Sequence, residues 1–191
     1  MATKRTQTIN KIIDATIKLS QANGFNRITV SQIIREVGIN RGTFYRYFRD
    51  KNDIFDTIEN QILDQITEYQ EQLINLDIHS IRNQLISGAF INQIVNLFDT
   101  HRAVLILLLS DNGDINFSNK LERFFTKMNQ KTIAKLNFTV SDKQKHIITV
   151  FLTGAVLSLL KLHLLSPAKY TEADISKASY ELIRDNLIHK L

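Results

Sequence analysis

One short segment carries side chains suited to contacting a nucleic acid: Arg41, Gly42, Thr43, Phe44, Tyr45, Arg46, Tyr47 and Phe48. On a helical wheel the two phenylalanines share one face, and the glycine, the threonine and the second arginine lie opposite. Either arginine can donate paired hydrogen bonds to guanine, the threonine can contact a thymine methyl, and the tyrosines can reach phosphates. The glycine lets the helix backbone approach the DNA closely. The pattern favours a helix in a DNA major groove, and the alternative is a small amphipathic helix with two surface tyrosines.

The residues before this segment predict the helix that would support it. Thr29 and Gln32 have the spacing of a capping box, so a helix should begin at Val30. Gly38 should end that helix after about two turns, and Asn40 is a good N-cap for a third helix at Arg41–Phe48. Two short helices joined by a glycine-containing turn form a helix-turn-helix pattern.

Longer helices are predicted on both sides. Apolar residues recur at helical spacing over Thr6–Asn23, and Gly24 can end that helix in a left-handed conformation. Asp50 resembles an N-cap for a helix over Lys51–Leu73. Lys51 at that helix start could hold a phosphate through its charge and the helix dipole, or it could be a surface lysine.

Positive charge is concentrated near the N-terminus. Residues 1–55 hold ten Lys and Arg against four Asp and Glu, whereas the remainder of the chain is nearly neutral. A basic module joined to a near-neutral one suggests that the first binds a polyanion, although a solvated basic face would have the same composition. We expect an all-α fold with two domains: a helix-turn-helix DNA-binding domain at 1–55, and a helical effector-binding and dimerisation domain at 56–191.

The run from Thr29 to Lys51, TVSQIIREVGINRGTFYRYFRDK, resembles the DNA-binding signature of the TetR family of transcriptional regulators. The usual pattern is T-V-x-x-I-A-x-x-A-G-V-S-x-G-T-x-Y-x-Y-F-x-x-K. Ile34 replaces the usual alanine and Asn40 the common serine, and both keep the role of the position. The resemblance covers about residues 8–56, including the preceding helix.

This resemblance implies roles for individual residues. Positions that usually contact phosphates are matched by Thr29, Tyr45, Tyr47 and Lys51. Positions near base edges are matched by Ser31, Arg41, Gly42 and Thr43. Family members are usually homodimers on palindromic operators, so double-stranded DNA with an inverted repeat is the expected partner. Most repress transcription, and a small molecule bound in the C-terminal domain releases them.

The rest of the chain predicts five or so further helices: Ile78–Asp99 (with a kink expected near Gly88), His101–Leu109, Leu121–Leu136, Lys143–Leu165 and Glu172–His189. The phrase from Leu107 to Asp114 is similar to a C-terminal domain type common in Gram-positive members of the family. Polar residues on otherwise apolar stretches are candidate contacts for an effector of unknown identity: Asn96, His101 and Ser110. They could equally be satisfied core groups.

Lys143–Leu165 has more apolar surface than one helix face needs. We expect it to pair with Glu172–His189 across a homodimer interface, as in related regulators. Ile147–Leu165 also has the length of a membrane span, but Lys161 and His163 within it argue for a buried or interface helix and against a membrane. With no secretory signal, we expect a cytoplasmic protein.

Several chemistries lack the residues they need. The chain has no cysteine, and its five histidines form no metal-binding pair, so no metal site and no cofactor are expected. Phosphate-binding glycine loops and nucleophile elbows are also absent from the sequence, which argues against an enzyme. A regulator that acts through a protein partner without an effector, and a membrane-associated helical protein, remain as alternatives.

Overall fold

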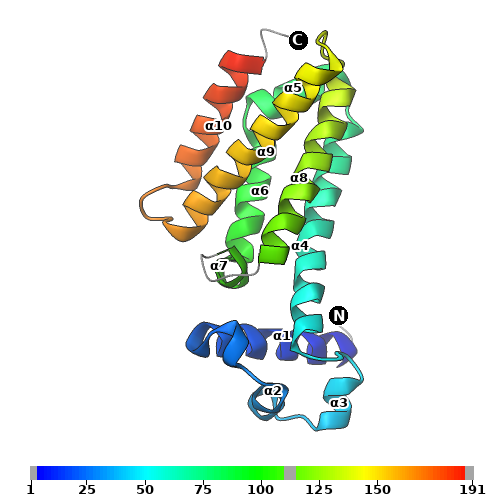
Figure 1. Cartoon of the computed structure of the whole chain (residues 1–191), viewed down its shortest axis with the longest axis vertical. Coiled ribbons are helices and arrows are strands. Elements are labelled where there is room, and N and C mark those ends of the chain that lie inside the picture. The colour runs from blue at the N-terminus through cyan, green and yellow to red at the C-terminus, as the bar shows by residue number, and fades with distance from the viewer. Residues whose placement is uncertain (1–3, 110–114, 188–191) are drawn as a thin grey trace. The chain divides into compact units, whose positions relative to one another are not determined.

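A computed structural model describes residues 4–109 and 115–187. It is 84% helical, with no strand among the described residues, which confirms the all-α prediction. The helices are α1 (Lys4–Asn23), α2 (Val30–Val37), α3 (Arg41–Tyr45), α4 (Lys51–Ile74), α5 (Ile78–Ile86), α6 (Ala89–Thr100), α7 (Arg102–Leu109), α8 (Ile115–Leu136), α9 (Asp142–Leu165) and α10 (Glu172–Leu187), and a 3-10 turn covers Phe25–Arg27 (Figure 1).

The chain divides into two units, Met1–Ile62 and Leu63–Leu191, so that α4 contributes its first turns to one and its later turns to the other. In the first unit, α1 packs against α2, and α2 contacts α3. Ile12, Ile33, Phe44 and Ile54 come from four successive helices and are all fully buried. Each lies on the apolar side that the sequence periodicity predicts, so this small core fixes the faces that remain exposed.

Three helix boundaries differ from the predicted ones by more than two residues. The kinked helix predicted over Ile78–Asp99 is two helices, because Gly88 adopts a left-handed φ of 72° that an α-helix does not contain. The third helix ends at Tyr45, and a turn leads from it to Phe48. The Phe48 N–H still donates to the Phe44 carbonyl at 3.0 Å. In α8 the first helical residue is Ile115, roughly one and a half turns before the predicted start.

The second unit is a bundle of the remaining helices, with α8 and α9 in the most extensive contact. One cluster of buried residues joins α4, α5, α8 and the segment after α8: Leu73, Ile81, Ile133, Leu136 and Phe138. Ser141 and Gln144 form a capping box that begins α9. The predicted range Glu172–His189 corresponds to α10, and its last residues lie outside the described part of the chain.

Helix α9 is long and apolar enough to cross a membrane by length and composition alone. Only 28% of its most apolar window is buried within the chain, so much of its apolar surface is open. An exposed apolar surface of this kind is typical of an interaction site.

Candidate nucleic-acid interface

Local interactions build the turn between α2 and α3. The Gly38 N–H donates to the Ile34 carbonyl at 3.0 Å, and Gly38 takes the left-handed conformation with φ of 72°. Asn40 then caps α3, because its side-chain oxygen accepts from the Thr43 N–H at 2.7 Å. Both predicted caps are confirmed, as is the capping box of Thr29 with Gln32. The ends of the two helices are therefore fixed by hydrogen bonds between residues three or four positions apart in the sequence.

Two phenylalanines anchor α3 and the following turn to the core. Phe44 is fully buried, Phe48 is 4% exposed, and their ring centroids lie 6.2 Å apart. The opposite side of this segment is open, with Arg41, Gly42, Tyr45 and Arg46 exposed and Thr43 and Tyr47 half-buried. Tyr45 is 54% exposed although its ring packs edge-on against Phe44. The segment therefore presents the predicted polar and aromatic strip to solvent while its other side is fixed.

The predicted base-contacting side chains of α2 and α3 lie together. The Arg41 guanidinium donates from Nη2 to the Ser31 hydroxyl at 3.0 Å, and both residues are exposed. One such bond leaves most of the arginine's five N–H donors available. The hydrogen bond directs the guanidinium along the exposed side of the two helices.

Glycine at position 42 is not required by the fold of this unit. A Cβ built on Gly42 would meet nothing nearer than Asn40 Oδ1 at 3.5 Å, an ordinary van der Waals contact. Its backbone is also in a conformation that any residue adopts, unlike Gly24, Gly38 and Gly88. The missing side chain therefore has no explanation in the packing of the isolated chain.

Lys51 has a role that sequence spacing did not reveal. Its Nζ donates to the backbone carbonyls of Asn26 and Ile28, at 3.1 and 3.2 Å, and so ties the first turn of α4 to the segment that leads into Thr29. It is half-buried rather than a solvent-facing lysine. Its partners lie more than twenty residues away in sequence, which is why no local pattern could indicate them.

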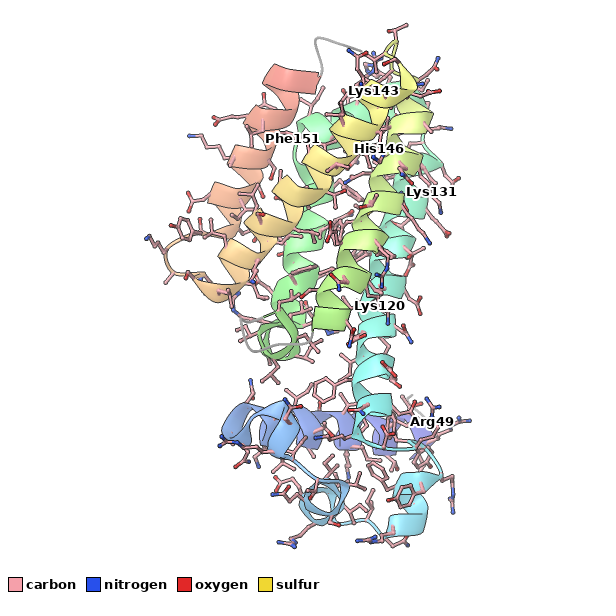
Figure 2. The ribbon with its side chains drawn as sticks, in the orientation of Figure 1. Arg49, Lys120, Lys131, Lys143, His146 and Phe151 are labelled. Atoms are coloured by element: carbon pink, nitrogen blue, oxygen red, sulfur yellow. The ribbon has the colours of Figure 1, made fainter. Side chains whose placement is uncertain are left out.

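Carboxylates cap the start of α4. Asp50 accepts from the N–H groups of Asn52 and Asp53, at 2.8 and 3.0 Å. Arg49, labelled in Figure 2, pairs with Asp53 through its guanidinium and its backbone N–H. The side-chain hydrogen bond from Arg49 is the main cause that lowers the pKa of Asp53. The two carboxylates fix the turn between α3 and α4 and accept hydrogen bonds from its backbone N–H groups.

The second unit contains an internal cavity. Side chains of α5, α6, α8, α9 and α10 enclose a cavity of about 90 Å³, and its walls include Phe90, Phe125, Met128 and Leu152. Of the predicted effector contacts, Asn96 is exposed on α6 and His101 follows that helix, and neither lines this cavity. Ser110 lies outside the described residues. Burial lowers the pKa of His101, as expected for an imidazole kept away from water.

A partly buried polar network joins α6, α7 and α9. His163 is 3% exposed; its Nε2 lies 3.0 Å from both Asp99 carboxylate oxygens, and its Nδ1 lies 2.7 Å from the Tyr170 carbonyl. Arg102 bonds the same carboxylate and also donates to the carbonyls of His163 and Leu164, at 2.9 and 2.8 Å. Both ring nitrogens therefore lie within hydrogen-bonding distance of oxygen atoms from other segments of the chain. Sequence reasoning gave no sign of this network.

The chain matches two protein families over its two parts. Residues 12–58 match "Bacterial regulatory proteins, tetR family", and residues 87–185 match "Transcriptional regulator C-terminal region". The second match covers just over half of the chain.

Curated relatives are transcriptional regulators. The fatty acid metabolism regulator protein of Bacillus subtilis is 34% identical over 62 residues, which are 32% of this chain and 32% of that protein. The chain thus matches about a third of that regulator's length. An HTH-type transcriptional regulator of Staphylococcus aureus is 27% identical over 143 residues, covering 75% of this chain and 72% of that protein.

Solved structures share the fold at low identity. NalD, the secondary repressor of a multidrug efflux pump in Pseudomonas aeruginosa, aligns with a TM-score of 0.73 and 18% identity over 98% of this chain and 100% of its own. A complex of SmeT with triclosan aligns with a TM-score of 0.71 and 18% identity, over 94% and 91% of the two chains. At these identities the likeness establishes the fold.

Proposed function

The chain belongs to the TetR family of DNA-binding transcriptional regulators, and from this premise we propose that it represses transcription as a homodimer on an inverted-repeat operator. Binding of a small molecule in its C-terminal part would release it. The family to which it belongs consists of regulators, not enzymes, and we place its action in the cytoplasm. Relatives from Bacillus and Staphylococcus agree with the Gram-positive subtype, which stays a prediction.

We assign the reading of DNA to the N-terminal residues, 1–55, and effector binding and dimerisation to 56–191. In this proposal the base edges are contacted by Ser31, Arg41, Gly42, Thr43 and Arg46, and phosphates by Thr29, Tyr45, Tyr47 and Lys51. The observation that carries the proposal is the exposed strip of α3, which is anchored from behind by Phe44 and Phe48. A plain surface helix would be expected to carry Glu and Lys there instead.

Selection from a random-sequence duplex library tests this proposal and does not require a known operator. The full-length protein should enrich a single inverted repeat whose half-sites are separated by about one helical turn or a multiple of it. A variant with Arg41 and Tyr45 both replaced by Ala should enrich nothing. Enrichment of an asymmetric single site would refute the symmetric dimer, and no enrichment by the wild-type protein would refute specific DNA reading.

The exposed surface of α9 supports the homodimer. Eight exposed residues follow helical spacing along one side of this helix: Ile147, Val150, Phe151, Gly154, Ser158, Lys161, Leu162 and Leu165. Phe151, labelled in Figure 2, is 59% exposed. A Cβ on Gly154 would meet nothing within 4 Å, so the small residue serves no packing inside the chain but would let a second helix approach closely. We propose that α9 and α10 pair with the same helices of a second copy.

Sedimentation of the full-length protein tests the interface. Phe151→Glu places a charge at the centre of the exposed stripe and should convert the dimer to a folded monomer. Ile106→Glu is the matched control, because Ile106 is an exposed apolar residue on α7 and does not belong to the stripe. A Phe151→Glu protein that stays dimeric would assign the dimer to another surface. Partition of the wild-type protein into a detergent phase would favour a membrane over a second copy as the cover of α9.

For the effector we propose the cavity among α5, α6, α8, α9 and α10. It is enclosed by apolar side chains, as small-molecule sites usually are. The neighbour SmeT has been solved with triclosan, which supports a ligand-binding role for this fold. Asn96 and His101 are weaker candidates because they do not line this cavity.

A further inference from the structure

The cavity of the second unit has an almost entirely hydrocarbon wall. Leu85, Phe90, Ile94, Phe125 and Leu152 are among the side chains that surround it. Two of its polar lining residues already have partners inside the chain: Asn129 donates to the Thr153 hydroxyl at 3.0 Å, and the Thr132 hydroxyl donates to the Met128 carbonyl at 3.2 Å. Most of the wall therefore offers a ligand only apolar contact.

Arg82 gives this apolar space a positive charge. Among the lining residues that the structure describes, it is the single charged side chain, and none of them is acidic. A guanidinium keeps its charge under all ordinary conditions and presents five N–H donors in a planar fork, so it can hold a carboxylate in addition to a protein partner. The electrostatics of the cavity thus favour an anion and disfavour a cation.

Ser179 provides a second polar group, on helix α10. Its side chain lies on the cavity wall and the residue is 4% exposed, yet its hydroxyl has no hydrogen-bond partner among the described residues. A buried hydroxyl without a partner carries a desolvation cost, which a ligand acceptor atom would remove. Helix α10, which carries Ser179, contacts α5, which carries Arg82. The two polar groups therefore come from neighbouring helices.

We propose that this cavity binds an amphipathic anion: an unbranched or compact hydrocarbon body with one carboxylate head, held by Arg82 and accepting a hydrogen bond from Ser179. The cavity volume, about 90 Å³, corresponds to about six to nine water-sized volumes, which suits a medium-length chain. This inference rests on the proposed effector role of the cavity, and it adds the chemical class of the ligand.

Calorimetry on the full-length wild-type protein with three eight-carbon probes tests the head group directly. Octanoate, octan-1-ol and octylamine have the same tail, so their differences report the head alone. We expect octanoate to bind at least about tenfold more tightly than octan-1-ol, and octylamine to bind more weakly than the alcohol. Equal affinity for the three, or no binding by any carboxylate from four to twelve carbons at millimolar concentration, overturns the proposal.

Variants then assign the preference to a residue. Arg82→Gln should lower octanoate affinity to that of octan-1-ol and leave the alcohol within about twofold, because the apolar contacts remain. Ser179→Ala should weaken octanoate by a few-fold. Arg123→Gln, at an exposed arginine of α8, is the matched control and should change nothing. An unchanged octanoate preference in folded Arg82→Gln overturns the assignment, and the wild-type comparison of head groups stands even if that variant does not fold.

The ligand class and the release mechanism fail separately. Binding is measured on the protein alone, whereas release is measured on the duplex selected from the library. Octanoate that binds through Arg82 but leaves the duplex bound would refute release and support the ligand class. Release by other compounds, with octanoate and octan-1-ol bound equally, would refute the ligand class and support release.

Discussion

Replacing Gly42 by alanine should move folding stability and DNA affinity in opposite directions. The added Cβ lies 3.5 Å from its nearest neighbour, so it introduces no clash within the chain. Alanine is favoured over glycine in a helix by up to about 1 kcal/mol, so the melting temperature should stay level or rise by at most about 2–4 °C. Against DNA the same methyl would hold the start of α3 away from the base edges.

The expected loss of operator affinity can be estimated from the base contacts that would break when the start of α3 is held away from the DNA. If one base contact is lost in each half-site, operator affinity falls by about 1–3 kcal/mol per half-site, or about 5- to 150-fold. Binding to random duplex depends mainly on phosphates and should change much less. Fluorescence anisotropy on both duplexes, together with thermal melts, measures all three quantities.

Asn10→Ala provides a matched control for this experiment. Asn10 is an exposed residue of α1 outside the predicted DNA-contacting set, so its replacement should raise helix stability and leave operator affinity unchanged. A Gly42→Ala protein that is as stable as wild type and binds the operator equally well would refute the close approach of α3 to DNA.

Three further perturbations follow from the same structure. Arg41→Ala should weaken operator binding by about 1–3 kcal/mol per half-site while barely affecting random duplex, as judged from binding curves on both DNAs. Lys51→Ala should weaken both duplexes alike, flatten the salt dependence by about 0.9 per lost phosphate contact, and lower the melting temperature because two carbonyls lose their donor. Burial opposes ionisation of Asp99, yet hydrogen bonds from Arg102 and His163 lower its pKa. The stabilising contribution of the Asp99 carboxylate should thus be present above about pH 4 and lost as pH falls through the lowered pKa. Asp99→Asn should flatten this acid-side loss of stability in thermal melts between about pH 3 and 7.

The helix-turn-helix could be predicted from sequence because its determinants are local. The capping box at Thr29, the left-handed Gly38 and the cap at Asn40 each act within three or four residues, and the structure contains all three. Helix α3 is shorter than its apolar spacing predicts, because Phe48 packs in the core through a turn just as it would from a helix. Apolar spacing reports burial, and it does not distinguish a last helical turn from a tight turn.

The interior of the second unit could not be predicted because its contacts join distant segments. His163 and Asp99 are 64 residues apart in sequence, and the cavity is shared by five helices. Asn96 is a polar residue in an apolar stretch, but the buried Val95 and Leu97 on either side turn it toward solvent. Which polar side chain faces a cavity depends on how the helices are rotated against one another, and sequence spacing does not specify that rotation.

Helix α9 connects the two proposed roles of the second unit. Leu152 and Val156 on one side line the cavity, and Phe151 on another side belongs to the exposed stripe. A ligand between α5 and α9 could therefore change how α9 packs against a second copy. It would do so only if the cavity has different shapes in the DNA-bound and free dimers. Because coupling between sites is reciprocal, a tenfold loss of operator affinity on saturation with octanoate requires octanoate to bind the free dimer about tenfold more tightly in total, over both cavities. Calorimetric titration of octanoate into the free protein and into its operator complex measures this ratio, and equal affinities would mean that the cavity and the DNA-binding surface are not coupled.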